Sequence, residues 1–376
     1  MRILLALLLC SCQYIPRATL DDGDSAACVY ERSPTFGPAG TVPVRAETVV
    51  SGLEVPWGVV FLPGGDLIIS ERPGRLRLVR GGKLVPAPIA TLQTGEAAEG
   101  GLLSIALHPR DPSLLYLYVT VPGPANRVER WRLAPDHASA QRDKVIFAGI
   151  KSGPFHNGGR IKFGPDGMLW IGTGDARTPD LAQDPQSPNG KILRLTPDGE
   201  PAPGNPIAGN PLFALGVRNC EAFDWLDPAT LILADHGPSG EMLRSGNDEV
   251  DVATAGANLG WPGIYGCQQH QGWVSPVLAF KEAMPPGGAV FYRGDAIPEW
   301  KDSFLIGTLK SKHLHRVVLD ASHRVTKHEV YFLSQLGRIR DVVVSPDGAL
   351  YLTTSNCDSR GDCPPEKDKL VRVLRD

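Results

Sequence analysis

One segment of the sequence combines a histidine and a carboxylate in a way that suggests acid–base chemistry. In FHNGGRIKFGPDGMLWIGTGDA, His156 stands directly before two glycines, which would let a ligand approach the backbone closely, and Asp175 ends the next apolar run. A histidine can accept a proton near neutral pH, and a carboxylate can orient the imidazole and stabilise its charged form. The pattern therefore suggests a general base with a supporting acid, although a turn histidine and a turn aspartate would give the same pattern.

Basic side chains recur at positions that could bind a ligand with several carboxylates. Arg218 and Asn219 stand in an apolar stretch, where an arginine needs a carboxylate partner from protein or ligand. Arg338 and Arg340 alternate before an apolar strand, so that both guanidinium groups point to one face. Together with Lys310, these cations are expected to face a common channel, the alternative being surface salt bridges.

A further segment, ADHGPSGEMLRSGNDEVDVATAGANLGWP, offers oxygen atoms at irregular spacing. Gly237 and Pro238 form a turn there, and Asp248, Glu249 and Asp251 follow it. Hard oxygen ligands suit Ca²⁺, which takes six to eight of them. The spacing of an EF-hand is absent, and a solvated acidic turn is the alternative.

A repeated phrase predicts the elements that must position these residues. A turn rich in Pro, Asp and Gly precedes a short apolar or alternating strand at 63–70, 111–120, 165–175, 227–235, 301–309 and 346–354. The aspartates of these turns are separated by 45 to 75 residues, and further apolar stretches follow the phrases. Repeats of this length with several strands each are typical of a β-propeller. We therefore predict an all-β, six-bladed β-propeller over residues 46–376, with two β-sandwiches as the alternative.

The composition agrees with this fold and excludes several functions. The 376 residues include 42 Gly and 34 Pro without the G-x-y period of collagen, which suits many tight turns. The 38 Lys and Arg balance 41 Asp and Glu to a net charge of −3, so there is no basic field for nucleic acid. No G-x-G-x-x-G follows a strand, which disfavours a nicotinamide cofactor.

The N-terminus has the features of an export signal. The apolar run at 3–10 is too short to cross a bilayer and is typical of a signal peptide. LCSC resembles a lipobox with Cys12 as the lipidated residue, and a plain signal peptide cut later is the alternative. We predict a signal peptide over 1–12, a tether over 13–45, and an exported protein that is periplasmic or at the cell surface, held by a lipid anchor.

Export makes disulfide bonds possible. Five cysteines follow the predicted lipidation site, namely Cys28, Cys220, Cys267, Cys357 and Cys363. Cys357 and Cys363 bracket a short loop and are the first expected pair, and Cys220 with Cys267 is the second. At least one of the five thiols stays unpaired.

Nine ordered motifs resemble the soluble glucose/sorbosone dehydrogenase family, and most of all its aldose sugar dehydrogenase branch. They are LEVPWGVVFLPGG, EGGLLSIALHP, HNGGRIKFGPDGMLWIGTGD, NGKILRL, GVRN, DHGP, NDEVD, GANLGWP and RIRDVVVSPDG, between about Glu54 and Arg372. The family's quinoprotein members bind pyrroloquinoline quinone (PQQ) and calcium on a six-bladed propeller. The resemblance implies an enzyme that oxidises aldoses to lactones at the anomeric carbon and passes hydride to PQQ. An external quinone, cytochrome or dye would reoxidise the cofactor.

The resemblance also implies roles for single residues. His156 matches the catalytic base and Asp175 its supporting carboxylate, while Arg218 and Asn219 match residues that touch cofactor and substrate. The cations around the quinone are matched by Lys310, Arg338 and Arg340. Glu99 stands where the family usually has a glutamine that lines the same pocket. It would favour the charged form of His156, unless it pairs with a nearby cation instead.

For calcium, the resemblance implies two positions. The backbone carbonyls of Gly237 and Pro238 match those that hold the calcium at the cofactor, and Glu249, with Asp248 beside it, matches a structural calcium site. Leu259 replaces a tyrosine of the family, and the chain is longer than usual over 239–247. Two rival functions remain open: a non-enzymatic extracellular propeller that binds protein or glycan, and a calcium-dependent propeller lactonase. Neither rival would need a histidine base together with the cations.

Overall fold

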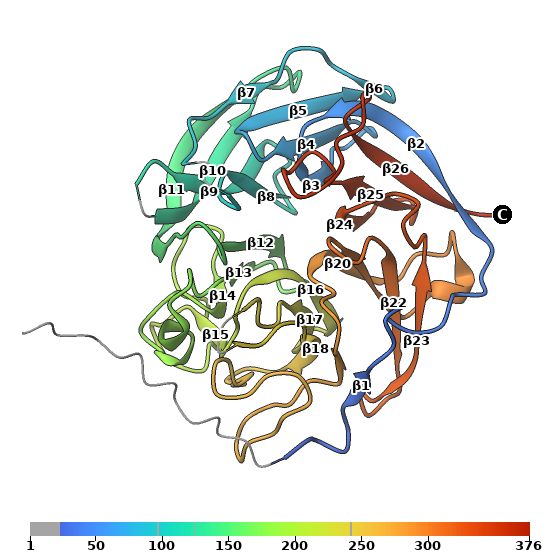
Figure 1. The fold of residues 1–376 in the computed structure, drawn as a ribbon. Coiled ribbons are helices and arrows are strands. Elements are labelled where there is room, and N and C mark those ends of the chain that lie inside the picture. The colour runs from blue at the N-terminus through green and yellow to red at the C-terminus, as the bar shows by residue number, and fades with distance from the viewer. Residues whose placement is uncertain (1–22, 96–97, 124, 241–242) are drawn as a thin grey trace, which may run out of the picture.

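The computed structural model describes residues 23–95, 98–123, 125–240 and 243–376. The expected signal peptide and Cys12 lie outside the described residues. Nearly all regular structure in the described chain is β-strand, arranged in six small sheets around a central axis (Figure 1). This arrangement confirms the predicted six-bladed β-propeller. No helix in the described part of the chain is long and apolar enough to cross a membrane.

The six blades follow one another along the chain. Blade 1 consists of β3 (Pro56–Phe61), β4 (Leu67–Glu71), β5 (Arg75–Arg80), β6 (Lys83–Leu84) and β7 (Ala90–Thr91), and blade 2 of β8 (Leu102–Leu107), β9 (Leu114–Val121), β10 (Ala125–Leu133) and β11 (Ala140–Lys151). Blade 3 consists of β12 (Gly158–Phe163), β13 (Leu169–Thr173), β14 (Lys191–Leu195) and β15 (Leu212–Leu215), and blade 4 of β16 (Cys220–Asp227), β17 (Thr230–Asp235), β18 (Asp248–Ala253) and β19 (Leu278–Phe280). Blade 5 consists of β20 (Pro286–Tyr292), β21 (Ser303–Thr308), β22 (Leu314–Leu319) and β23 (Val325–Tyr331). Blade 6 consists of β24 (Ile339–Val344), β25 (Leu350–Thr354), β26 (Asp368–Arg375) and β2 (Val44–Leu53). The first strand named in each blade lies nearest the axis, and blade 6 takes its outer strand from the N-terminal part of the chain (Figure 1).

The repeated phrase of the sequence is the turn from the first to the second strand of each blade. In four of these turns the aspartate, namely Asp111, Asp166, Asp227 or Asp347, accepts a backbone N–H two residues ahead. Asp111 accepts from Ser113 at 3.0 Å and Asp166 from Met168 at 3.0 Å. An aspartate that bonds its own backbone in this way stabilises a tight turn without help from distant residues, which explains why the repeat was visible in the sequence.

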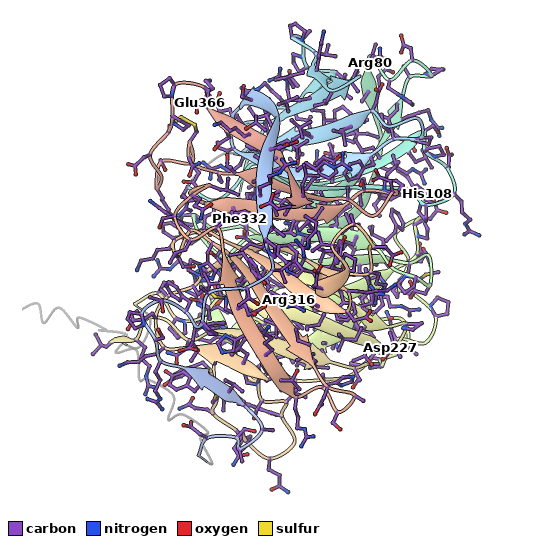
Figure 2. All side chains as sticks on the ribbon, turned by 90° about the vertical axis from the view of Figure 1, so that its right-hand side faces the viewer. Arg80, His108, Asp227, Arg316, Phe332 and Glu366 are labelled. Atoms are coloured by element: carbon purple, nitrogen blue, oxygen red, sulfur yellow. A yellow bond between two sulfur atoms is a disulfide. The ribbon has the colours of Figure 1, made fainter. Side chains whose placement is uncertain are left out.

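Apolar side chains from neighbouring blades pack against each other and hold the inner strands in place. Tyr118, Ile161 and Ile171 belong to one buried cluster between blades 2 and 3, and Trp170 and Phe223 belong to another between blades 3 and 4. In the side view, side chains fill the space between the sheets (Figure 2). The ends of the inner strands are therefore fixed relative to one another, as a site built from several blades requires.

The N-terminal segment joins the propeller, which corrects the expected tether over 13–45 for its described part. β1 (Val29–Glu31) pairs in parallel with β19 of blade 4, and Gly40 donates to Val330 of blade 5 at 2.9 Å. β2 then pairs with β26 and closes the ring. Pairing with sheet edges satisfies backbone groups that a free tether would leave to water.

Of the two expected disulfides, one is confirmed and one is wrong. Cys357 is bonded to Cys363. Cys267 is bonded to Cys28 of the N-terminal segment instead of Cys220. Cys220 is a buried free thiol at the start of β16, packed so tightly on blade 3 that a Cβ on Gly172 would lie 2.9 Å from its sulfur. Its place in an inner strand keeps it away from the outer loop that carries Cys267.

Candidate active site at one end of the propeller axis

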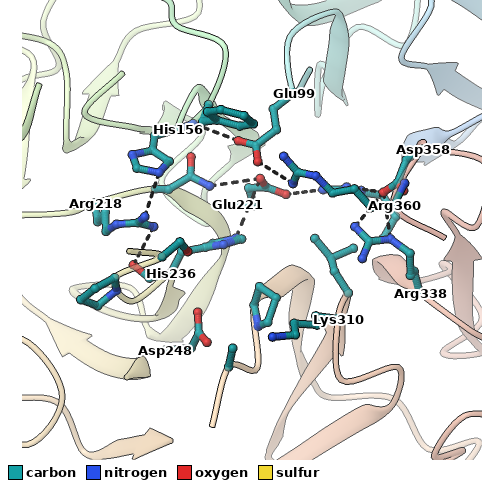
Figure 3. A pocket seen from close by; sticks show the side chains of 18 of the residues that line it. Glu99, His156, Arg218, Glu221, His236, Asp248, Lys310, Arg338, Asp358 and Arg360 are labelled. Atoms are coloured by element: carbon teal, nitrogen blue, oxygen red, sulfur yellow. Dashed lines mark hydrogen bonds and ion pairs between the residues drawn. The ribbon is translucent and has the colours of Figure 1, made fainter. Parts of the chain in front are cut away.

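A pocket of about 580 Å³ opens at the end of the propeller opposite the repeated turns. Its walls come from the segments that enter the first strands and from those that link second and third strands. Because neighbouring strands in a blade are antiparallel, these two kinds of segment meet at the same end. Figure 3 shows the side chains from several blades converging there.

Most of the residues expected from the sequence line this pocket. They are Glu99, His156, Arg218, Asn219, Pro238, Asp248, Lys310, Arg338 and Arg340. Asp175, Gly237 and Glu249 are not part of its lining. Asp175 touches His156 from behind, and the N–H of Gly237 contacts Asp248. Glu249 contacts the loop that contains Gly266.

His156 is held between a carboxylate and a guanidinium. Its Nδ1 lies 2.7 Å from Asp175 Oδ1, and its Nε2 lies 2.8 Å from Arg218 Nη2. Because a guanidinium can only donate hydrogen bonds, Nε2 must be the acceptor and the neutral ring carries its proton on Nδ1. Trp261 donates to the other oxygen of Asp175 at 2.9 Å. Nε2 is therefore the unprotonated nitrogen that a general base needs, and in this structure its lone pair accepts the N–H of Arg218.

Glycines close to His156 serve the packing of the protein itself. His156 has a φ of 60°, and a Cβ on Gly174 would lie 2.1 Å from its carbonyl oxygen. A Cβ on Gly158 would lie 2.5 Å from Thr173, and one on Gly159 would lie 2.6 Å from a side-chain carbon of blade 2. These close approaches are to protein atoms, so the expectation that Gly158 and Gly159 make room for a ligand is not what the structure shows.

Arg338 and Arg340 point to one side of β24 and line the pocket, as the period-two spacing predicted. Each is paired with an acidic side chain that the sequence analysis missed. Arg338 donates from Nε and Nη2 to Asp358 at 2.9 and 2.8 Å. Arg340 forms a short ion pair with Glu221, and its Nη2 lies 3.5 Å from Asp358.

Burial and charge act differently on these two acids. Burial raises the pKa of Glu221, and the guanidinium of Arg340 offsets only part of that rise. Burial also acts to raise the pKa of Asp358, but Arg340 and Arg338 outweigh it and hold that pKa below its usual range. Asp358 therefore keeps its negative charge to lower pH than Glu221 does, and Glu221 takes up a proton more readily.

The charged lining of the pocket has a positive surplus. Among the described residues of the lining, the basic side chains are Arg72, Arg177, Arg218, Lys310, Arg338, Arg340 and Arg360, and the carboxylates are Glu99, Glu221, Asp248 and Asp358. Within the described lining, basic side chains therefore outnumber carboxylates. Lys310 is exposed and forms no ion pair with any described residue. Such a surplus in a concave site favours a ligand with several negative charges.

Acidic residues at the start of β18 point in two directions. Asp248 faces the pocket and accepts N–H groups of Gly237 at 3.0 Å and Met284 at 2.6 Å, and burial raises its pKa to about 6. Glu249 points to the other face and accepts from Gly266 at 2.7 Å. Asp251 lies on that same face, fully buried, and neither of its carboxylate oxygens has a hydrogen-bond partner among the described residues.

Burial raises the pKa values of Glu249 and Asp251, and their mutual repulsion raises that of Glu249 further. These two acids lie close together in a low-dielectric environment, where a bound cation would stabilise their charged forms. In the described part of the chain, however, no three His, Cys, Asp or Glu side chains are grouped so that they could hold a metal ion.

Glu99 reaches His156 through the backbone and not through the imidazole. Its Oε2 accepts the backbone N–H of His156 at 2.9 Å, and its Oε1 pairs with Arg360 at 2.8 Å. The second of the two expectations for Glu99, pairing with a nearby cation, is the one that the structure shows.

Several pocket residues were not singled out from the sequence. Besides Glu221 and Asp358, they include Phe155, Arg177, His236 and Arg360. His236 stands in the DHGP motif, and burial lowers its pKa well below the usual value, so it is neutral. The only sequence signal for Asp358 and Arg360 was their position between the two cysteines that close a loop.

Comparisons with known proteins agree with the fold and with this site. A family model described as glucose/sorbosone dehydrogenase matches residues 53–363. The aldose sugar dehydrogenase YliI of Escherichia coli is 30% identical over 84% of this chain and 91% of its own. An oxidoreductase described as a glucose dehydrogenase, from Thermus thermophilus, is 43% identical with a TM-score of 0.81, covering 88% of this chain and 100% of that one. A PQQ-bound aldose sugar dehydrogenase from Streptomyces coelicolor is 33% identical with a TM-score of 0.80, covering 90% and 99%. The chain therefore belongs to the glucose/sorbosone dehydrogenase family, which confirms the resemblance seen in its motifs.

Proposed function

We propose that this protein is a quinoprotein dehydrogenase that oxidises aldoses at the anomeric carbon to lactones, with PQQ as the hydride acceptor. The observation that carries the proposal is an imidazole with an accepting Nε2 inside a pocket whose described lining has more basic side chains than carboxylates, with Lys310, Arg338 and Arg340 among them. The PQQ-bound relative from Streptomyces coelicolor supports the choice of cofactor.

In the proposed reaction, His156 Nε2 takes the proton of the anomeric hydroxyl group. Asp175 fixes the ring through Nδ1 and stabilises the imidazolium that forms. Arg218, now hydrogen-bonded to Nε2, is placed to donate to the sugar oxygen and to stabilise its developing negative charge. The positive φ of His156 is held by the close packing of Gly174, so the base is positioned before substrate arrives.

The residues of the pocket fit PQQ, which is a tricarboxylic acid. Arg338, Arg340 and Lys310 are the cations that would hold its acid groups, and Asn219 lies in the lining nearby. When bound, the quinone supplies the carbon that accepts hydride. The protein's contribution is to bind and orient it and to keep Asp358 and Glu221 as counter-ions of the two arginines.

We also propose two positions for calcium. Main-chain oxygens of Gly237 and Pro238 would hold one ion beside the cofactor, in a turn that Asp248 anchors through the N–H of Gly237. A Cβ at Gly237 would lie 2.2 Å from a neighbouring carbonyl oxygen, so this turn requires glycine. Glu249 would contribute to a second, structural ion, for which the buried and unpartnered carboxylate of Asp251 is an additional candidate ligand.

We further propose that the protein is exported and passes electrons to an external quinone or cytochrome. The two disulfides, Cys28–Cys267 and Cys357–Cys363, favour an oxidising compartment. Lipidation at Cys12 would add a membrane anchor. Mass spectrometry of the mature N-terminus tests that part, because an unmodified terminus beyond residue 12 contradicts the lipid and leaves export standing.

Reconstitution tests the proposed enzyme activity. Purified apo-protein should show no sugar-dependent dye reduction, and activity should appear after addition of PQQ with Ca²⁺. Undiminished dye reduction by cofactor-free protein in the presence of a chelator would contradict the proposal.

A further inference from the structure

The mouth of the pocket contains an aromatic ring between two arginines. The guanidinium carbon of Arg177 lies 5.6 Å from the centroid of the Phe155 ring, and that of Arg360 lies 5.3 Å from it. All three side chains line the pocket that contains His156, and Phe155 directly precedes His156 in the chain. None of the three has been given a role in the proposed reaction.

Arg177 is held in place by the group that orients the base. Its backbone N–H donates to Asp175 Oδ1 at 2.7 Å, the same oxygen that accepts from the imidazole of His156. Arg177 and the preceding Ala176 have positive φ values of 58° and 50°. Two successive residues in this sparsely populated region store strain, which persists only where the surrounding contacts hold it. The backbone of Arg177, from which its side chain reaches the mouth, is therefore fixed relative to the base.

Arg360 reaches the mouth from the opposite side of the propeller. It lies in the loop that the Cys357–Cys363 disulfide closes, and it pairs with Glu99 at 2.8 Å. Arg177, in contrast, is exposed and forms no ion pair with any described acidic residue. Two guanidinium groups thus meet around one ring, and among the described residues Arg360 has a carboxylate partner, Glu99, while Arg177 has none.

We propose that this mouth binds the carboxylate of a hexuronic acid, so that acidic aldoses are the preferred substrates. This inference rests on the proposed dehydrogenase function. In the ring form of a hexuronic acid the anomeric carbon and the carbon that carries the carboxylate lie on opposite sides of the ring oxygen, so the anomeric hydroxyl can meet His156 while the carboxylate meets Arg177. Phe155 offers an apolar surface for the C–H groups of the sugar, and Arg177 offers the paired N–H groups that match a carboxylate.

The reaction itself is that of the neutral sugar. The anomeric O–H gives its proton to His156 Nε2, the anomeric C–H gives its hydride to the quinone, and a carbonyl double bond forms between the same carbon and oxygen. The product is the lactone of the corresponding dicarboxylic sugar acid. The carboxylate at the mouth takes no part in bond making, so neutral aldoses remain substrates without this charged contact.

Steady-state kinetics of the reconstituted enzyme test the inference. We expect kcat/KM for glucuronate to exceed that for glucose by about tenfold, the usual worth of a hydrogen bond to a charged group. Arg177→Gln should lower the ratio of the two kcat/KM values by about the same factor, and Arg177→Lys should lower it less. Added salt should reduce the preference, because the contact is electrostatic and lies at an exposed mouth. Arg324→Gln is the matched control: Arg324 is exposed and pairs with Asp320 at the far turn of blade 5, and its loss should leave the ratio unchanged.

A binding measurement separates this inference from the proposed function. Calorimetric titration of the cofactor-free protein with glucuronate should give a binding heat. Glucose should give less heat with the same protein, and the Arg177→Gln variant should give less heat with glucuronate. An enzyme that oxidises glucose as well as glucuronate, with a ratio that Arg177→Gln does not change, overturns the inference and leaves the proposed function standing. A reconstituted enzyme that oxidises neither sugar contradicts the proposed function.

Discussion

The two sides of the pocket balance their charges in different ways (Figure 3). On the side of blades 3 and 4, His156 already has a partner for each ring nitrogen, Asp175 behind it and Arg218 in front. On the side of blades 5 and 6, Arg338 and Arg340 are paired with carboxylates of the protein, Asp358 and Glu221. In the first arrangement a protein donor occupies the lone pair of the base until substrate replaces it, whereas in the second, carboxylates of the protein neutralise cations that could also bind an anionic ligand.

This difference indicates that chemistry and cofactor binding are separated in space. Substitutions on the side of His156 should change kcat, because its partners orient a proton acceptor. Substitutions on the side of Arg338 should change cofactor affinity, because its partners set how much positive charge is available. Each measurement below tests whether catalysis and cofactor binding are separated in this way.

The largest effect is expected for His156→Ala. Loss of a positioned general base lowers kcat by about 10²–10⁴. PQQ affinity should stay near the wild-type value, since Lys310, Arg338 and Arg340 do not contact the imidazole, whose basic partner is Arg218. Single-turnover kinetics and a quinone titration of the same preparation measure both quantities. An undiminished kcat in this variant would remove the proposed mechanism.

Arg338→Ala should weaken cofactor binding. Truncation of one partner of a buried charge pair costs roughly 2–5 kcal/mol, since Asp358 would also be left without its main counter-ion. Lys310→Ala should cost less, because Lys310 is exposed and its charge is screened by water. Quinone titrations of both variants show which substitution lowers the PQQ affinity more. Unchanged affinity in both would mean that these cations do not hold the quinone.

The pH dependence of cofactor binding should depend on Glu221. Burial raises its pKa above the ordinary value of 4.5, so Glu221 is neutral below that raised pKa and charged above it. A neutral Glu221 leaves the pocket more positive, and PQQ affinity should therefore fall severalfold as the pH rises through the raised pKa.

Glu221→Gln supplies the control for this pH effect. Glutamine keeps the size of the side chain but cannot lose a proton, so the variant should lose the pH dependence of binding while it retains the higher affinity. A wild-type affinity that is constant from about pH 4 to about pH 8 would show that Glu221 does not titrate in the working range.

The smallest effect is expected for Glu99→Gln. Glu99 meets His156 only at the backbone N–H and pairs with Arg360. The variant should therefore lose the ion pair with Arg360 without altering the imidazole of His156. The acid limbs of the pH–rate profiles of wild type and variant should superimpose. A shift of that limb toward lower pH in Glu99→Gln would place the carboxylate in electrostatic contact with the imidazole after all.

The sequence was most informative where a feature depends on neighbouring residues. The six turns could be recognised because turn-forming residues recur in them and, as at Asp166, an aspartate can close a turn through neighbouring backbone, and each turn precedes the second strand of a blade. Arg338 and Arg340 could be placed on one face because side chains alternate along a strand. Cys357 and Cys363 could be paired because they lie only six positions apart in the sequence.

The tertiary structure alone decided which distant residues meet. Glu221 lies 119 residues from Arg340, and Cys28 lies 239 residues from Cys267, so no local pattern could show these pairs. The same holds for Phe155 and Arg360, which stand on blades far apart in the chain. The repeats specify strands and turns at one end of the propeller, where each blade resembles the next. The pocket forms at the other end, where the blades differ and where ring closure brings unlike segments together, so its partners follow from the packing of the whole ring.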